Sequence, residues 1–253
     1  MGLLSTPAVL LRSHPFSETS RILRFYTREA GLVGTVARGI RTRGSKGRGG
    51  VESLAVGTLS AYVKPGRELQ TFKDFSPDLS TPSAGRDPSA LAGGAALAEM
   101  VLRHAGEDSN PELFHALVEG LRAVASAPGP DVLVVTLATG WRIVAVLGYQ
   151  PELDACVSCG ALLDSEREAM RFDYSAGGLR CPDCSVGVVG PRIKPESRRD
   201  LARMISGSLP EGDLARPTAH LALLDDFVTY HVSGGDSLRS LGVLRELLEA
   251  RRG

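Results

Sequence analysis

Four cysteines are the side chains with the clearest chemistry in this chain. Cys156 and Cys159 enclose two residues, Cys181 and Cys184 enclose two more, and 21 residues separate the pairs. This spacing is typical of structural zinc sites, because a two-residue turn lets both thiolates face one tetrahedral ion. Four thiolates close the coordination shell, so we expect a Zn²⁺ ion that stabilises a loop and binds no substrate. Two redox-active pairs, or a site that has lost its metal, are the alternatives.

A catalytic zinc site fits the cysteine pattern less well. Zinc deaminases also use a Pro-Cys-x-x-Cys element, and they add a catalytic glutamate two residues beyond a His or Cys ligand. Here Pro182 lies inside the second pair, and the residue two beyond Cys156 is Ser158. The chain also has no G-x-x-x-x-G-K-[ST] phosphate loop. We therefore predict no catalytic residues and a protein that is not an enzyme.

A second group of functional side chains is cationic. Residues 39–50 read GIRTRGSKGRGG and hold four cations, five glycines and no carboxylate. Cations bind phosphates, and glycines let a loop follow an irregular backbone, so we predict a DNA-binding loop. Its candidate contacts are Arg38, Arg41, Arg43, Lys46 and Arg48. A solvated loop without a binding role is the alternative.

Further cations and aromatic residues extend this candidate surface within the first 80 residues. The cations are Arg12, Arg21, Arg24, Arg28, Lys64, Arg67 and Lys73. Side chains able to stack on bases are Phe16, Phe25, Tyr26, Tyr62 and Phe72. Because Phe25, Tyr62 and Phe72 lie within apolar runs, we expect these three in the core instead.

The distribution of charge supports a polyanionic partner for the first part of the chain. The 253 residues include 29 Lys and Arg and 29 Asp and Glu, so the formal net charge is zero. Residues 1–79 nevertheless hold 12 of the cations and only 6 of the acids. We expect a polyanion to meet this basic region and not the acidic remainder.

The apolar pattern changes along the chain. Between residues 6 and 75, short runs rich in Val, Ile, Leu, Phe and Tyr alternate with turn residues, which predicts five or six strands in a small antiparallel barrel or sandwich. After a linker at 81–89 the period becomes helical. We expect helices at 90–104, from Pro111 onward, at 131–148 with Asp131 as N-cap, and at 196–205, 219–231 and 238–249. A small hairpin is predicted over 170–180, between the cysteine pairs.

These patterns predict an α+β multidomain chain. We assign a β-barrel domain to 1–80, the first part of a helical domain to 81–150, a zinc module to 151–190 and the second helical part to 191–253. No run of 18 apolar residues and no signal peptide is recognisable. We therefore expect a soluble cytosolic protein with no membrane partner. In the cytosol, cysteines serve as thiols or metal ligands more often than as disulfides.

Three segments resemble the RecO family of bacterial recombination mediators. They are AVLLRSHPFSETSRILRFYTREAGLVGTVARGIR at 8–41, WRIVAVLGYQPELDACVSCG at 141–160 and YHVSGGDSLRSLGVLREL at 230–247. The segments follow the order of the family and span most of the chain. The resemblance implies an OB-fold N-terminal domain and an α-helical domain with an inserted four-cysteine zinc module.

The resemblance also implies a function. RecO-like proteins bind single- and double-stranded DNA, anneal complementary strands, associate with RecR and recognise the acidic tail of single-stranded DNA-binding protein (SSB). With RecR they help to load RecA onto SSB-covered single strands, in the bacterial cytoplasm at the nucleoid. Within 138–142 only Arg142 is cationic, so we assign no residues to the SSB tail. The alternative functions are a zinc-stabilised protein-interaction adaptor without direct DNA binding and, third, a metalloenzyme.

Overall fold

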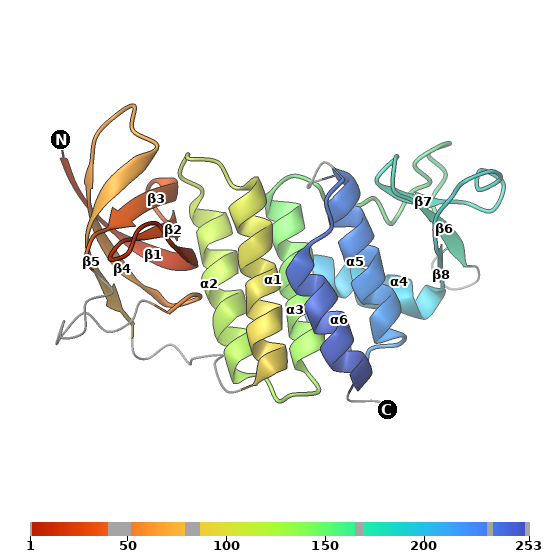
Figure 1. Cartoon of the computed structure of the whole chain (residues 1–253). Coiled ribbons are helices and arrows are strands. Elements are labelled where there is room, and N and C mark those ends of the chain that lie inside the picture. The colour runs from red at the N-terminus through yellow and green to blue at the C-terminus, as the bar shows by residue number, and fades with distance from the viewer. Residues whose placement is uncertain (1, 40–51, 79–86, 165–168, 232–234, 251–253) are drawn as a thin grey trace.

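A β-barrel, a group of helices and a small sheet follow one another along the molecule (Figure 1). The computed structural model describes residues 2–39, 52–78, 87–164, 169–231 and 235–250. The barrel lies at one end and the small sheet at the other, with the helices between them. In the described part of the chain, no helix is long and apolar enough to cross a membrane.

Five strands form the closed N-terminal barrel. They are β1 (Gly2–Pro15), β2 (Arg21–Thr27), β3 (Gly31–Ala37), β4 (Val56–Val63) and β5 (Leu69–Pro77). Their neighbour order is β1-β2-β3-β5-β4, and β1 also pairs with β4 and closes the barrel. The predicted OB-fold barrel is confirmed, but the expectation of a purely antiparallel sheet is wrong. Since β4 pairs with β1 and not with β3, its hairpin partner β5 meets β3 in parallel.

The barrel has its own apolar interior. Its buried side chains are Ala8, Leu10, Leu23, Phe25, Val33, Ala37, Leu59, Ala61 and Phe75. The predicted core position of Phe25 is confirmed, and its ring lies 6.4 Å from that of Phe72 and 5.2 Å from that of Phe75. The core prediction for Tyr62 is wrong, because this side chain is 39% exposed. Tyr62 follows the inward Ala61 along β4, so the alternation of a strand turns it outward.

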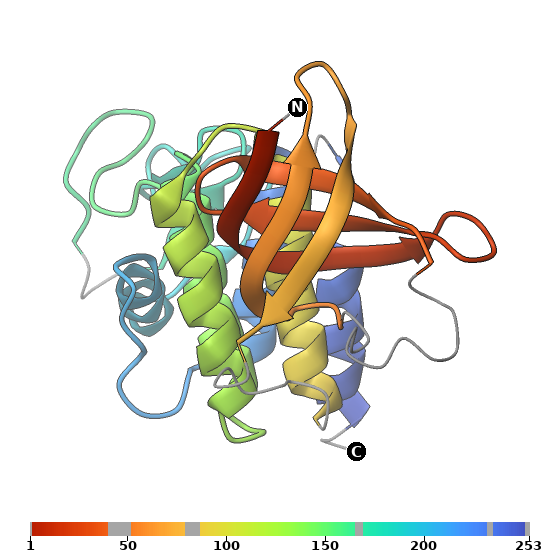
Figure 2. The same cartoon turned by 90° about the vertical axis from the view of Figure 1, so that its left-hand side faces the viewer.

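One outer side of the barrel is sealed against the helices. Val9, Leu11, Tyr26 and Val56 point out of the barrel and join the core of the helical domain. The Leu32 amide donates to the carbonyl of Gly106 at 3.0 Å. At Gly31, where φ is +55°, a Cβ atom would lie 2.5 Å from the Gly106 carbonyl oxygen, so the junction requires glycine. None of the described helices lies over the opposite side of the barrel (Figure 2).

The helical domain contains six helices among the residues that the structure describes. They are α1 (Pro88–His104), α2 (Pro111–Ser126), α3 (Val132–Val146), α4 (Pro195–Ile205), α5 (Pro217–His231) and α6 (Arg239–Ala250). Asp87 accepts a hydrogen bond from the Ser89 amide at 2.9 Å, and Asn110 accepts one from Leu113 at 3.0 Å, so both residues cap their helices. Asp131 lies at the N-cap of α3 but makes no side-chain cap hydrogen bond. The apolar α3 is central, as predicted, and its Trp141 is fully buried.

The helices on either side of the cysteine region pack together. α6 lies beside α1, and α4 and α5 lie beside α3. Glu99 of α1 accepts hydrogen bonds from the backbone amides of Ser240 at 2.9 Å and Arg239 at 3.4 Å, which begin α6. A carboxylate from one helix thus satisfies the amino end of another that lies about 140 residues away.

A three-stranded sheet supports the cysteine region. It contains β6 (Met170–Asp173), β7 (Gly178–Arg180) and β8 (Arg192–Ile193), in the order β7-β6-β8. The predicted hairpin is confirmed as β6 and β7, whereas β8 was not predicted because two residues carry no alternation. Phe172 of β6 is fully buried, with its ring 5.9 Å from that of Phe227 on α5. The sheet is therefore packed against the helices by an aromatic contact.

Candidate metal centre and nucleic-acid interface

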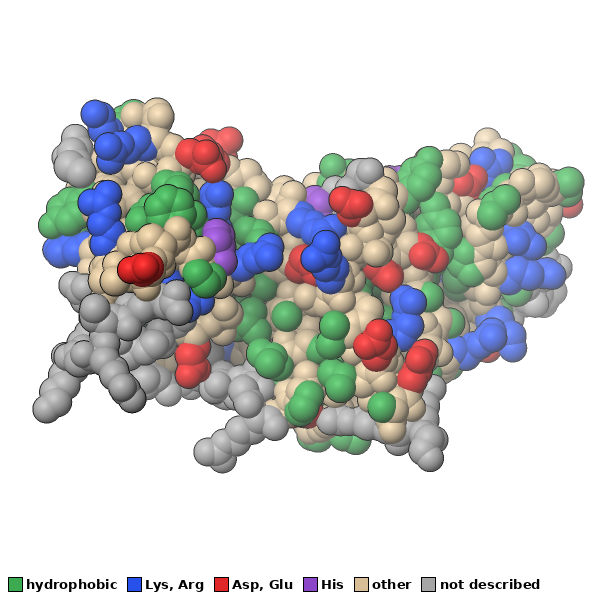
Figure 3. All heavy atoms as spheres, in the orientation of Figure 1, with side chains coloured by type: hydrophobic (Ala, Val, Ile, Leu, Met, Phe, Trp, Pro, Cys, Tyr) green, Lys and Arg blue, Asp and Glu red, His purple; other side chains and the backbone are tan. Residues whose placement is uncertain are grey.

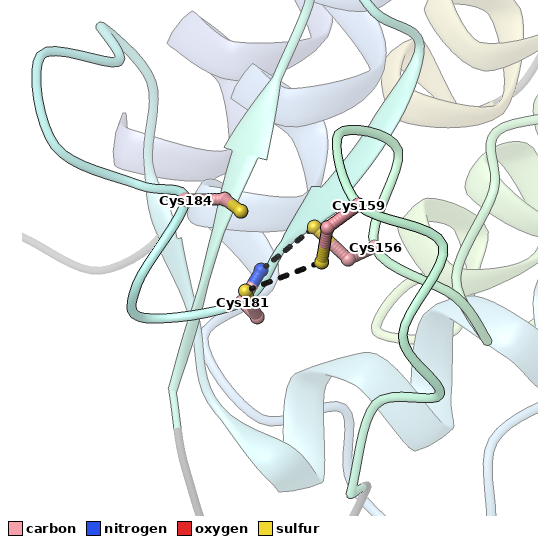
Figure 4. A group of neighbouring side chains, drawn as sticks. All are labelled: Cys156, Cys159, Cys181 and Cys184. Carbon is pink, nitrogen blue, oxygen red and sulfur yellow. Dashed lines mark hydrogen bonds between the residues drawn. The ribbon is translucent and has the colours of Figure 1, made fainter.

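The two cysteine pairs come together in space (Figure 4). The four Sγ atoms lie within 4.8 Å of one another, and those of Cys159 and Cys181 are 3.9 Å apart. Sulfurs bound to one tetrahedral zinc at about 2.3 Å would be about 3.8 Å apart. In chemistry and in spacing, this donor set therefore fits a metal ion with four sulfur ligands.

Local backbone bonds shape each cysteine turn. The Cys156 amide donates to the Ala161 carbonyl at 2.8 Å, and the Gly160 amide donates to the Cys156 carbonyl at 2.8 Å. Gly160 has a φ of +73°, the left-handed conformation that closes the first turn. In the second turn the Cys184 amide donates to the Cys181 carbonyl at 3.1 Å. A further backbone bond, from the Val157 amide to the Leu179 carbonyl at 2.9 Å, holds the first turn against the strand that leads into the second.

The thiols are electrostatically unequal. Burial of Cys156 opposes ionisation, but backbone N–H groups of Cys181, Cys159 and Ser158 outweigh it and lower the pKa of this thiol to about 6. Hydrogen bonds with Cys181 and Cys159 raise the pKa of the Cys184 thiol to about 12. Four thiolates at this separation repel one another, and a divalent cation removes that repulsion.

The hairpin between the cysteine pairs is held by Asp173. Its carboxylate accepts hydrogen bonds from the Ser175 amide at 2.9 Å and from the Arg180 guanidinium at 2.7 Å. Burial opposes ionisation of Asp173, but these bonds and the charge of Arg180 outweigh it and lower its pKa. Because Arg180 directly precedes Cys181, this ion pair fixes the chain where it enters the second cysteine turn.

Three of the predicted DNA-contact residues lie on β1 and β2. Arg12 and Arg24 are directly paired across these strands, and Arg12 is exposed. The Arg24 guanidinium forms an ion pair with Glu68 at 3.2 Å and lies over Gly34, where a Cβ would approach it to 2.7 Å. Arg21 donates from Nε to the Ser13 hydroxyl at 2.7 Å. Arg21 and Arg24 are thus already engaged within the barrel, and the sequence analysis did not predict Glu68 as the partner of Arg24.

The remaining predicted contacts lie in loops. Arg38 is exposed just after β3, and Lys64 and Arg67 are exposed in the β4–β5 hairpin. Figure 3 shows several Lys and Arg side chains on one face of the barrel. The other predicted contacts, Arg41, Arg43, Lys46 and Arg48, lie outside the described residues. The structure therefore pairs Arg12 with Arg24, leaves Arg21 at the start of β2, and links Arg24 through Glu68 to the hairpin that carries Lys64 and Arg67.

Sequence reasoning missed the residue that braces this hairpin. The Gln70 amide nitrogen donates to the carbonyls of Arg67 at 2.8 Å and Lys64 at 3.3 Å, and its oxygen accepts from the Lys64 amide at 2.8 Å. The only sequence signal that Gln70 braces the hairpin is its position: it is a polar residue at the start of a strand that follows a Pro-Gly turn. The three bonds fix the backbone from which both cations project.

Known proteins match the two halves of this architecture. The family model "Recombination protein O N terminal" matches residues 1–77, and "Recombination protein O C terminal" matches residues 85–241. Among individual relatives, a DNA repair protein RecO of Desulfitobacterium hafniense is 30% identical over 76% of this chain and 68% of its own length. A DNA repair protein RecO of Rubrobacter xylanophilus is 30% identical over 73% of this chain and 72% of its own length. A Synechococcus relative is 34% identical over 69% of this chain and 60% of its own length.

The matches and the geometry agree. The N-terminal match covers the barrel, and the C-terminal match covers the helices up to the start of α6 together with the cysteine centre between them. These matches support a role in DNA repair and recombination. The chain belongs to the RecO family.

Proposed function

We propose that this chain is a non-enzymatic DNA-binding recombination mediator that acts in the bacterial cytoplasm at the nucleoid. The observation that carries the proposal is a set of exposed cations on the N-terminal barrel that have no acidic partner among the described residues. Arg12, Arg38, Lys64 and Arg67 are exposed and form no ion pair within the described part of the chain. Cations without acidic partners are available to phosphates at little cost in desolvation.

The proposed mechanism is sequence-independent neutralisation of phosphates. If the five cations between Arg38 and Arg48 all met phosphates of one strand, log K would fall with log salt at a slope of about −3.5. Neutralised strands repel each other less, and contacts to phosphates leave the base edges free to pair. The barrel would therefore bind single and double strands and promote annealing.

The proposed domains divide this work. The division follows the predicted boundaries, with the barrel at 1–80, the helical domain at 81–150 and 191–253, and the zinc module at 151–190. The barrel would bind DNA, while the helical domain would present surfaces for RecR and for the acidic tail of SSB. Together with RecR, the protein would help to load RecA onto SSB-covered single strands.

We propose one structural Zn²⁺ held by Cys156, Cys159, Cys181 and Cys184. When bound, the ion supplies a closed tetrahedral link between the two cysteine turns. X-ray absorption of the purified full chain is expected to show one zinc with four sulfur ligands. An open nitrogen or water ligand would contradict a structural site and support a metalloenzyme.

Fluorescence anisotropy with a labelled single strand at two salt concentrations tests the DNA-binding proposal. Replacing Arg41, Arg43, Lys46 and Arg48 together with Ala is expected to weaken binding and to flatten its salt dependence. The control removes four cations from β8, from the N-cap of α4 and from α4 itself by replacing Arg192, Lys194, Arg199 and Arg203 with Ala. An unchanged slope in the loop variant would remove the loop from the mechanism.

One observation favours the protein-interaction adaptor as a second candidate function. Leu162, Val186 and Val189 of the zinc module are 86%, 89% and 91% exposed. Aliphatic side chains with this exposure suit a protein partner better than DNA phosphates. The same titration separates the two functions, because an adaptor without DNA binding gives no change in anisotropy even at low salt.

A further inference from the structure

An exposed aromatic residue lies on the same outer side of the barrel hairpin as several cations. Tyr62 of β4 is 39% exposed, and its cross-strand partner on β1 is Leu3, which is 55% exposed. The two residues are directly opposite each other, so their side chains share one face of the sheet. This pair therefore forms a small exposed apolar surface on the barrel.

A bulge in β5 brings a cation to this aromatic ring. The pairing of β4 with β5 shifts between Ser60, which faces Asp74, and Ala61, which faces Phe72, so Lys73 has no partner on β4. The shift keeps Phe72 stacked on Phe25 inside the barrel. It also turns Lys73 outward, with its Nζ 5.8 Å from the centre of the Tyr62 ring.

The neighbouring turn adds two more cations in a fixed position. Gln70 binds the backbone of Lys64 and Arg67 through the three hydrogen bonds described above. The turn therefore has little freedom to lose on binding, although the side chains that it carries are exposed. In both views the β4–β5 hairpin that bears these residues extends beyond the rest of the barrel (Figures 1 and 2).

We propose that the β4–β5 hairpin is a base-stacking subsite for single-stranded nucleic acid. Tyr62 stacks on one base, Leu3 contacts the edge of that base, and Lys73, Lys64 and Arg67 bind the adjacent phosphates. A base inside a duplex is not accessible to stacking, so this subsite prefers single strands to double strands. The inference rests on the proposed DNA-binding function and specifies which form of DNA this hairpin selects.

The test compares two probes and three variants of the full chain. The probes are a labelled oligo(dT) strand and a strand of the same length in which abasic sites replace the bases but keep the phosphates. Tyr62→Ala removes the ring, and Tyr62→Phe keeps it. Tyr230→Ala is the matched control, because Tyr230 is an exposed tyrosine on α5, at 56% exposure.

We expect wild type, Tyr62→Phe and Tyr230→Ala to bind oligo(dT) more tightly than the abasic strand. Tyr62→Ala should lose about tenfold in affinity for oligo(dT) and little for the abasic strand. Equal binding of oligo(dT) by Tyr62→Ala and wild type would overturn the inference and leave DNA binding intact. Equal losses on both probes would also overturn it, because the ring would then act without contacting a base. A wild-type chain that binds neither probe would overturn the DNA-binding function itself, and the inference with it.

Discussion

The cysteine centre and the cationic barrel surface are built in different ways. The four cysteines lie in two short turns of one segment, which the β6–β7 hairpin and the bond from the Val157 amide to the Leu179 carbonyl at 2.9 Å bring together. The exposed cations come from β1, from the end of β3 and from the β4–β5 hairpin, and strand pairing alone brings them onto one domain. A metal centre is thus a local structure, whereas an electrostatic surface is a property of the whole fold.

This difference predicts two kinds of response to mutation. A tetrahedral site needs all four ligands, so the loss of one should abolish it. Contacts to phosphates contribute separately, so the loss of one cation should weaken binding by a fraction. We expect an effect of intermediate size at Glu99. It joins α1 to α6 through a single side chain, but the metal site does not depend on it.

Replacement of one ligand, Cys156→Ser, is expected to have the largest effect. Metal binding to structural zinc sites is worth on the order of 10 kcal/mol at neutral pH, which is comparable to the whole stability of a domain. We expect the variant to lose its metal and the region around β6 and β7 to lose protection from hydrogen exchange. The barrel should keep its protection and its affinity for DNA.

The metal content per chain and the exchange rates of Phe172 and Leu179, both fully buried, measure this outcome. Ser158→Ala is the control, because it changes the same turn and keeps every sulfur. If Cys156→Ser retained one metal ion per chain, or if its hairpin stayed protected, the centre would not behave as an all-or-none site.

Replacement of Glu99 by Gln should have an intermediate effect. Burial opposes ionisation of Glu99, but hydrogen bonds from Ser240, the charge of Arg103 and the amide of Arg239 outweigh it and lower its pKa. Its carboxylate also pairs with Arg103 at 2.6 Å. Loss of hydrogen bonds to a charged group costs about 2 kcal/mol, which we expect in urea unfolding of Glu99→Gln at pH 7.

The direction of the pKa shift of Glu99 fixes the pH dependence. A carboxyl group whose pKa is lower in the folded chain stabilises the fold above its unfolded pKa of about 4.3. This stabilisation is lost as the pH falls through the lower folded value, so the gap between wild type and Glu99→Gln should narrow in acid. Glu119→Gln is the control, because Glu119 pairs with Arg142 at 2.6 Å but is 62% exposed. Equal losses in the two variants would contradict a special role for Glu99.

Elements with a strong local pattern could be predicted from the sequence. The cysteine spacing, the prolines at the starts of α1, α2 and α4, and the long apolar α3 each contain their own signal. The two-residue strand β8 could not be predicted, because its partner β6 lies about twenty residues away and the strand is too short to alternate.

Pairing between distant residues explains the other errors. The parallel pairing of β3 with β5 depends on which strand β4 pairs with, and no local sequence pattern predicts that partner. Tyr62 lies in an apolar run, yet the register of its strand turns it outward. The ion pair between Arg24 and Glu68 joins residues 44 positions apart. The sequence could therefore predict which cations belong to the candidate surface, but not which of them are already bound to a carboxylate.

The difference between a free and an ion-paired arginine gives the smallest predicted effect, a change in the salt dependence of DNA binding. Arg12 and Arg24 are opposite each other, but among the described residues only Arg24 pairs with a carboxylate, that of Glu68 at 3.2 Å. Arg12→Ala should therefore flatten the slope of log K against log salt for a single strand by about 0.7, and Arg24→Ala by less. Glu68→Gln should strengthen binding, because it removes a negative charge and releases Arg24 for a phosphate. Anisotropy titrations of the three variants measure these slopes. A larger change for Arg24→Ala than for Arg12→Ala, or weaker binding by Glu68→Gln, would mean that the ion pair itself orients Arg24 towards DNA and that the surface is not a set of independent cations.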